Sequence, residues 1–142
     1  MINDIINGIA TKLNETFGNG YQVWRENIKQ GLTEPCFSIV ALEPEQSAKL
    51  PNRYLRRYPF DIHYFPKDKL KEKEECYTVA EELLMVLEYI NVLDNLCRGT
   101  KMRYEVVDGV LHFFVNYDLF IKKQVAGADQ MEKLNVKSTT EG

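Results

Sequence analysis

The sequence predicts an α+β domain, a two-layer sandwich whose mainly antiparallel sheet of about four to five strands carries two helices on one face. Three observations lead to this class. Two segments repeat apolar residues at helical spacing, several others alternate apolar and polar residues as strands do, and an Asp-Gly pair marks a hairpin. The expected order is helix, strand, strand, strand, helix, strand, strand.

The chain has 142 residues, of which 44% are apolar and 11% aromatic, and this suits one domain with its own core. We expect that domain to span residues 1–123 and a polar, flexible C-terminal tail to occupy residues 124–142, with a weak helical turn near Gln130–Leu134. No apolar run approaches the roughly 20 residues that cross a bilayer, and no signal peptide is expected. Three widely spaced cysteines suit synthesis in a reducing cytosol.

Both helices are predicted from apolar stripes. The first is expected from Ile2 to Phe17, and Gly18-Asn19-Gly20 ends it. The second is expected over Glu74–Tyr89, after a charged turn at Pro66–Lys73, with glutamates near its N-terminus where the helix dipole favours them. Its stripe consists of Val79, Ala80, Leu83, Val86, Leu87 and Ile90.

The first two strands are expected at Tyr21–Glu26 and Cys36–Leu42, joined by the loop Asn27–Pro35. Pro44–Asn52 is interpreted as a polar connection, because prolines 44 and 51 should prevent a strand.

The third strand is expected at Arg53–Phe65. Its apolar face would hold Tyr58, Phe60, Ile62 and Tyr64. Because Pro59 lacks the N–H group that a ladder needs, we expect this strand at a sheet edge or bulged there.

Asp108-Gly109 predicts a two-residue type I′ turn, since both positions need a positive φ. The turn fixes the register of the last two strands, and the second would run from Val110 to Lys122. The expected pairs are Val107–Val110, Val106–Leu111, Glu105–His112, Tyr104–Phe113, Arg103–Phe114 and Met102–Val115. This strand and Arg53–Phe65 are longer than usual, so we expect them to project beyond their own core.

The search for chemistry is negative, and we expect neither an enzyme nor a cofactor. His63 and His112 lie in different strands without a ligand-spaced neighbour, so they are interpreted as polar positions on the solvent side of the sheet and not as metal ligands. The three cysteines lie in or beside apolar stretches, where cysteine behaves as a small hydrophobe. The glycines form no phosphate-binding loop.

A basic stretch from Lys49 to Lys73 holds eight of the 18 Lys and Arg residues, while the second helix is acidic. The stretch is either a solvated surface or one that binds an acidic partner, and segregated charges would suit head-to-tail packing into a ring. The candidate interface combines residue types enriched at binding hot spots. It consists of Arg53, Tyr54, Arg56, Arg57 and Tyr58.

Four sequence blocks together resemble the phage tail terminator family of phages and prophages of Gram-positive bacteria. The blocks are Met1–Ile6 with Lys12–Asn14; Glu26–Asn27 with Gln30–Leu32 and Glu34–Phe37; Asn52–Tyr54 with Tyr58–Pro66; and Arg98–Met102 with Val107–Phe113. The resemblance covers roughly residues 1–123. It implies an architecture similar to that of the tail terminator of phage lambda.

The resemblance implies a structural protein of the virion tail, made and assembled in the bacterial host cytoplasm. Such proteins form a hexameric ring that caps the head-proximal end of the tail tube, stops its polymerisation and receives the head–tail connector. The implied partners are further copies of the chain, the tube protein, the connector and, in a contractile tail, the sheath protein. Genome DNA would pass through the lumen without sequence-specific binding, and no membrane is involved.

Two other classes remain open beside a terminator or another neck or tail-completion protein. A small ligand-binding regulatory domain would show a defined pocket with perturbed titratable groups. A nucleic-acid-binding module is disfavoured by the formal net charge of −3.

Overall fold

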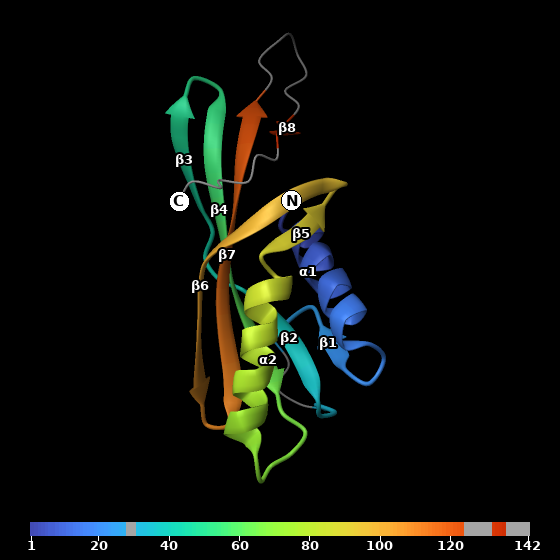
Figure 1. Ribbon diagram of the computed structural model, residues 1–142. Coiled ribbons are helices and arrows are strands. Elements are labelled where there is room, and N and C mark those ends of the chain that lie inside the picture. The colour runs from blue at the N-terminus through green and yellow to red at the C-terminus, as the bar shows by residue number, and fades with distance from the viewer. Residues whose placement is uncertain (28–30, 124–131, 136–142) are drawn as a thin grey trace.

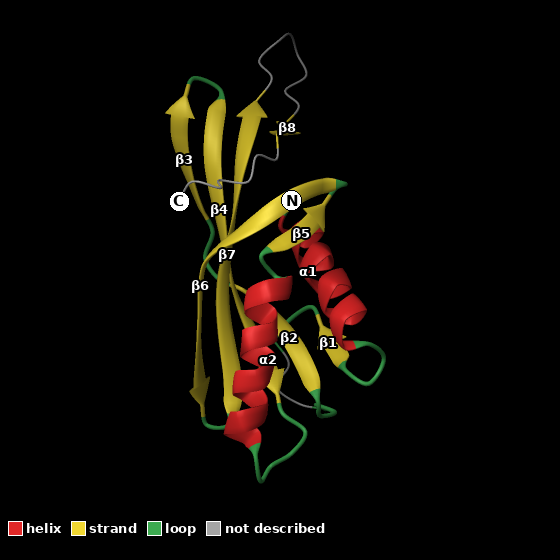
Figure 2. Cartoon of the chain, in the orientation of Figure 1, coloured by secondary structure: helices red, strands yellow, loops and turns green. Residues whose placement is uncertain are grey.

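A computed structural model describes residues 1–27, 31–123 and 132–135. Figure 1 shows two helices beside a long, curled sheet, and Figure 2 shows both helices on the same side of it. None of the described helices is long and apolar enough to cross a membrane. The elements are α1 (Ile2–Phe17), β1 (Gln22–Trp24), β2 (Cys36–Ala41), β3 (Glu45–Leu50), β4 (Arg53–Phe65), α2 (Glu72–Val86), β5 (Tyr89–Val92), β6 (Asn95–Val107), β7 (Val110–Lys123) and β8 (Glu132–Asn135).

The sheet has the order β1-β2-β4-β7-β6-β5, with β3 paired to β4 and β8 paired to β7. Every pairing is antiparallel except that of β1 with β2. The predicted α+β class with helices on one face is therefore confirmed. The described residues form eight strands, however, which is more than the four to five predicted.

The additional strands are short segments that the sequence patterns concealed. The polar connection predicted at Pro44–Asn52 is wrong, because β3 lies between the two prolines and forms a hairpin with β4, turning at Asn52, which has a positive φ. The C-terminal end predicted for the second helix, Tyr89, is wrong, because α2 ends at Val86. Ile90, expected in the apolar stripe of this helix, lies in β5. Residues 132–135 form β8 and no helical turn. The rest of the predicted tail lies outside the described residues.

Most other predicted elements are confirmed with small changes of boundary. Helix α1 and strand β4 have the predicted bounds, and the hairpin register holds from Val107–Val110 to Arg103–Phe114. The predicted pair Met102–Val115 is wrong, because the ladder shifts between Thr100 and Arg103, where Lys101 takes a positive φ of 52°. Beyond this bulge β6 still pairs with β7 at Thr100 and Gly99, and its first residues, Asn95 to Arg98, pair with β5.

Strands β4 and β7 form the centre of the fold. Their ladder runs from Arg53–Lys122 to Tyr64–Leu111. On the face toward the helices, the predicted row of β4 is buried, and so are the residues opposite it on β7. This row consists of Tyr58, Phe60, Ile62 and Tyr64 opposite Tyr117, Val115, Phe113 and Leu111. Burying each such side chain contributes roughly 1.5–3 kcal/mol, so this double row is the largest part of the core.

Pro59 is not at a sheet edge, which corrects the prediction. It lies in a central strand, at the point where the neighbour of β4 changes from β3 to β2. The carbonyl of Pro59 accepts a hydrogen bond of 2.9 Å from the N–H of Leu42, so its missing N–H would face this same side. The proline therefore fits because its carbonyl keeps this bond, while no N–H donor is required at the junction between two partner strands.

The same junction divides the sheet into two parts. The body is the part under the helices, where β4 and β7 are flanked by β2 and β6. The arm consists of β3, residues 53–57 of β4, residues 118–123 of β7, and β8. Figure 1 shows β3, the start of β4 and the end of β7 extending past both helices. The long strands extend past the helices, but the expectation that they project beyond their own core holds only in part, because Leu55, Leu119 and Ile121 of the arm are buried.

Gly8 lets α1 pack closely against β5. A Cβ atom at this position would lie 2.5 Å from the backbone oxygen of Asn91 and 3.4 Å from the side chain of Ile90. The first distance is far below van der Waals contact, and a backbone oxygen has no rotamer to move into. The helix therefore needs glycine here although glycine weakens helices by about 1 kcal/mol relative to alanine.

We expect Gly8→Ala to lower the free energy of unfolding by about 1–2 kcal/mol, because the cost of overpacking exceeds the gain in helix propensity. Urea unfolding followed by circular dichroism measures the change. Gly20→Ala is the matched control, since a Cβ there meets nothing within 4 Å. An unchanged or higher stability of Gly8→Ala would contradict this account of the packing.

Candidate functional site

The arm is the first candidate because helices leave it uncovered. All six residues of β3 are exposed, and Leu50 at its end is 58% exposed. The backbone groups of Pro59 point toward the side of β4 on which β2 and β3 lie, so those of the other odd-numbered residues of β4 do so too. The residues of β3 opposite them, Glu45 and Ser47, bond to β4. The N–H groups of Gln46 and Ala48 therefore point to the outer edge of β3. An exposed edge of this kind offers unpaired hydrogen-bonding groups to another chain.

The candidate interface residues do not form one patch. Side chains alternate along β4, so Tyr54 and Arg56 share a face with Tyr58, whereas Arg53 and Arg57 point to the other face. Arg53 is exposed, but Tyr58 is only 6% exposed and belongs to the core. Of the five residues, four lie on the arm and Tyr58 lies at its junction with the body.

Within the arm, the arginines contact residues of β3. The Nε of Arg56 donates a hydrogen bond to Gln46, and Arg57 lies 3.6 Å from the carboxylate of Glu45. Asp118 lies opposite Arg57 on β7; burial raises the pKa of its carboxyl group, and Arg57 and Lys101 oppose this. One oxygen of Asp118 and the Nε of Arg57 are buried without a hydrogen-bond partner.

The basic stretch predicted from Lys49 to Lys73 is divided by the fold. Lys49 and Arg53 lie at the β3–β4 turn, and the lysines from Lys67 to Lys73 lie around the connection from β4 to α2. These groups occupy opposite ends of β4, as Figure 1 shows, and a strand of 13 residues spans roughly 40 Å. The sequence stretch therefore does not make a single basic surface.

A second polar cluster lies on the sheet face opposite the helices. His63 of β4 pairs with His112 of β7, and their ring centroids are 4.4 Å apart. The Nε2 atom of His63 and the Nδ1 atom of His112 lie 2.9 and 3.0 Å from the same oxygen of Asp61. Burial raises the pKa of Asp61, but the hydrogen bonds from the two histidines outweigh it and lower the pKa.

The expectation that His63 and His112 have no ligand-spaced neighbour is wrong. Asp61 shares a strand face with His63, and His112 is the cross-strand neighbour of His63. The local alternation placed each histidine on the outer face correctly. The register between β4 and β7, however, joins segments about 50 residues apart, and no local pattern in the sequence specifies it.

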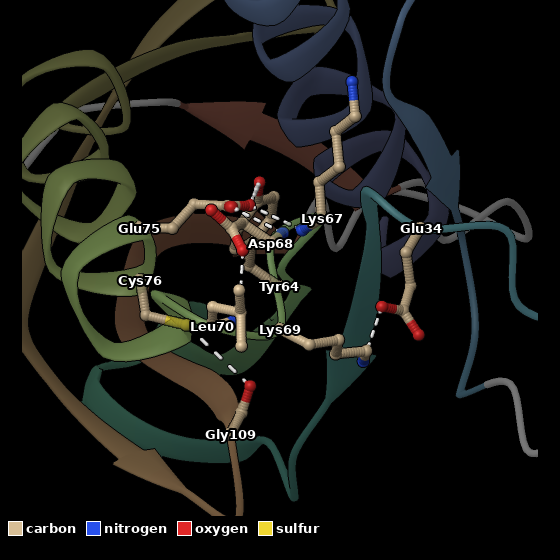
Figure 3. A network of polar contacts seen from close by, with 9 residues as sticks. All are labelled: Glu34, Tyr64, Lys67, Asp68, Lys69, Leu70, Glu75, Cys76 and Gly109. Atoms are coloured by element: carbon tan, nitrogen blue, oxygen red, sulfur yellow. Dashed lines mark hydrogen bonds and ion pairs between the residues drawn. The ribbon is translucent and has the colours of Figure 1, made fainter.

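The third cluster joins β4 to α2 and is drawn in Figure 3. Glu75, in the first turn of α2, accepts hydrogen bonds from the hydroxyl of Tyr64 at 2.5 Å and from the N–H groups of Lys67 and Asp68 at 2.7 and 3.0 Å. Lys69 in the same connection forms an ion pair of 2.6 Å with Glu34. These bonds set where α2 begins, so the cluster is structural in character.

The described residues do not bring a nucleophile to a base. Cys36, Cys76 and Cys97 are all buried and unpaired. Burial raises the pKa of Cys76 to about 11 and that of Cys97 to about 12, and neighbouring carboxylates add to both shifts. Buried thiols of this kind pack as small apolar groups and are inert as nucleophiles.

A cleft of about 400 Å³ lies between α1 and the β5–β6 turn. Its charged lining residues include Asp4, Lys12 and Glu15, which are all at least partly exposed. A mixed, solvated lining of this kind lacks the apolar walls and convergent polar groups of a ligand pocket. It does not favour the ligand-binding alternative.

The Glu75 cluster predicts a pH-dependent stability. Burial raises the pKa of Glu75, but its hydrogen bonds from Tyr64, Asp68 and Lys67 outweigh this and lower the pKa. Because the folded pKa lies below the unfolded value of about 4.3, the carboxylate stabilises the fold above that pH. This contribution is lost as the pH falls through the folded pKa.

We therefore expect Glu75→Gln to lower the free energy of unfolding by about 1 kcal/mol at pH 7, and the difference from the native chain to shrink below about pH 4.3. Urea unfolding over a pH series measures both effects. Glu74→Gln, an exposed neighbour on α2, should change stability little. A difference that stays constant or grows in acid would refute the assignment.

A comparison with models of known protein families gives a match. A family model described as phage tail terminator protein matches residues 4–129, which is most of the chain and includes the arm strands β3, β4 and β7. No curated protein matches the chain. The extent of the family match shows that the chain belongs to the phage tail terminator family.

Proposed function

We propose that this chain closes the head-proximal end of the tail tube as a ring of copies, ends tube polymerisation and provides the docking surface for the head connector. Membership of the family assigns a structural role in the phage tail and makes the chain a virion component. The ring, its six-fold number, its position and its individual partners are the proposal. Beside the tube protein and the connector, these partners include the sheath protein if the tail contracts, and DNA crosses the lumen without sequence-specific binding.

The arm is the observation that carries the proposal. A strand edge that one chain leaves unpaired is an aggregation hazard unless another chain covers it in the assembled state. All six residues of β3 are exposed among the described residues, and β3 lies on the part of the sheet that the helices do not cover. Contact between the arm and a neighbouring copy or the last tube ring would bury this edge.

Termination then follows from geometry. A tube end exposes the subunit surface to which the next tube ring would bind. A terminator that covers this surface without presenting a further copy of it stops growth, and no chemical step is required. The absence of an assembled catalytic group among the described residues is compatible with such a mechanism, but the arm supports it directly.

We place the first contacts at the arm residues of the candidate interface, with Arg53 as the most accessible. Its guanidinium group can bind carboxylates with two hydrogen bonds, and arginine is enriched where interfaces are tightest. Tyr58 is assigned a supporting role only, because its side chain is buried in the core.

The purified chain is expected to decorate only the ends of tail tubes assembled from the tube protein of the same phage, as seen by negative-stain imaging. Light scattering over a concentration series gives the oligomeric state before and after contact with the tubes. Phage lacking the protein should form overlong tails. Decoration along the tube wall would refute the proposal, and tails of normal length that fail only to join heads would favour another neck protein.

We expect Arg53→Glu to reduce end decoration at least about tenfold, because it reverses a charge at the proposed contact while the side chain is exposed. Lys73→Glu is the matched control: it makes the same change of charge at an exposed position on α2, at the opposite end of β4. Circular dichroism verifies the fold of both variants. Equal decoration by the two would remove Arg53 from the contact.

A further inference from the structure

We propose that Asp61, His63 and His112 form a binding site for a divalent transition-metal ion of the zinc class. The site lies on the face of the sheet opposite the helices, and it is independent of the proposed function. Its ligand atoms are Oδ2 of Asp61, Nε2 of His63 and Nδ1 of His112, which all lie within 4.8 Å of one another.

The fold holds these groups on rigid backbone. Asp61 and His63 are two residues apart on β4, so their side chains share a face, and His112 lies directly opposite His63 on β7. Both strands are paired on both sides at this level, β4 with β2 and β7 with β6. Ligands on such central strands are positioned before an ion arrives, which lowers the ordering cost of binding.

The distances are close to those that a metal ion requires. Zinc binds imidazole nitrogen and carboxylate oxygen at about 2.0–2.1 Å, and a tetrahedral arrangement then separates two ligand atoms by about 3.3 Å. The two nitrogen–oxygen distances are 2.9 and 3.0 Å. Replacing the two hydrogen bonds by metal bonds requires that each facing ring nitrogen lose its proton and that the rings turn their lone pairs toward one common position.

Asp61 supplies an independent observation. Its side chain is only 11% exposed, and its Oδ1 atom is buried without a hydrogen-bond partner. Leaving a buried polar atom unpaired costs about 1–3 kcal/mol, and the cost is greater for a charged group. A cation on Oδ2 would stabilise the negative charge of this buried carboxylate in place of the two histidine hydrogen bonds.

The donor set favours zinc, nickel, copper or cobalt over calcium or magnesium, which prefer oxygen ligands. The histidine side chains are 14% and 25% exposed, so an ion can enter from solvent. Three protein ligands leave one position of a tetrahedron for water or a further side chain. Glu105, opposite His112 on β6, is the neighbouring carboxylate on that face.

A bound ion would connect β4 to β7 in the body, next to the junction from which the arm extends. It would stabilise the folded chain according to its concentration relative to Kd. The competing interpretation is a carboxylate–histidine hydrogen-bond network that binds no ion. The two interpretations differ in what the metal-free chain does when an ion is added.

The test uses the full chain after treatment with a chelator, at pH 7.5, titrated with Zn²⁺ by calorimetry and with Co²⁺ by visible absorption. We expect about one ion per chain with a micromolar Kd, a four-coordinate Co²⁺ spectrum and a higher Tm. His63→Gln and His112→Gln should each weaken binding at least about 100-fold, more than the loss of an outer-shell group does. Glu82→Gln, which changes an exposed carboxylate on α2, should bind as the native chain does.

A measurement by NMR on the native chain tests the site without depending on the folding of any variant. The chain has only two histidines, so imidazole NMR signals report on this site alone. Zn²⁺ should shift both rings together at one equivalent. No binding up to millimolar ion, unmoved imidazole signals, or equal binding by His63→Gln would overturn the proposal and leave the hydrogen-bond network.

Discussion

The ladder between β4 and β7 is the constraint on which the rest of the molecule depends. It is the only pairing that runs through both the body and the arm among the described residues. In the body it presents the buried row that includes Phe60 and Phe113 to the helices. The hydroxyl of Tyr117 adds a bond of 2.7 Å to the carbonyl of Leu87, which ties the end of α2 to the same ladder. A change of register by one residue would reverse both faces of the sheet at once.

The sequence was most informative where a pattern is local. The stripe of α1, the alternation of β4 and the Asp108-Gly109 turn each depend on residues a few positions apart, and all three were predicted correctly. The errors have the opposite origin. β3 is mostly polar and all its residues are exposed, so its sequence lacks the apolar alternation that predicts a strand. Its pairing with β4 makes it a strand. The end of α2 was missed because the apolar residues of β5 continue its helical stripe.

The candidate sites follow the same division. Alternation along β4 places Arg53 and Arg57 on one face and Arg56 on the other. The predicted interface treated the three arginines as one group because they are close in the sequence. The cluster of Asp61, His63 and His112 could not be predicted, because it forms only after two distant segments have paired in one register. Only the spacing of Asp61 and His63, two residues apart in one predicted strand, was visible in the sequence.

The junction at Pro59 has a consequence for how this protein can change during evolution. The short connection between β2 and β3 crosses the sheet boundary beside Pro59, so an insertion after Leu42 lies between the β2 and β3 pairings with β4. The outer edge of the arm can thus be lengthened, shortened or recharged while the body keeps its packing. A lineage could therefore alter this hairpin without changing the residues that pack beneath the helices. Divergence among relatives should accordingly accumulate in β3 and spare the residues beneath the helices.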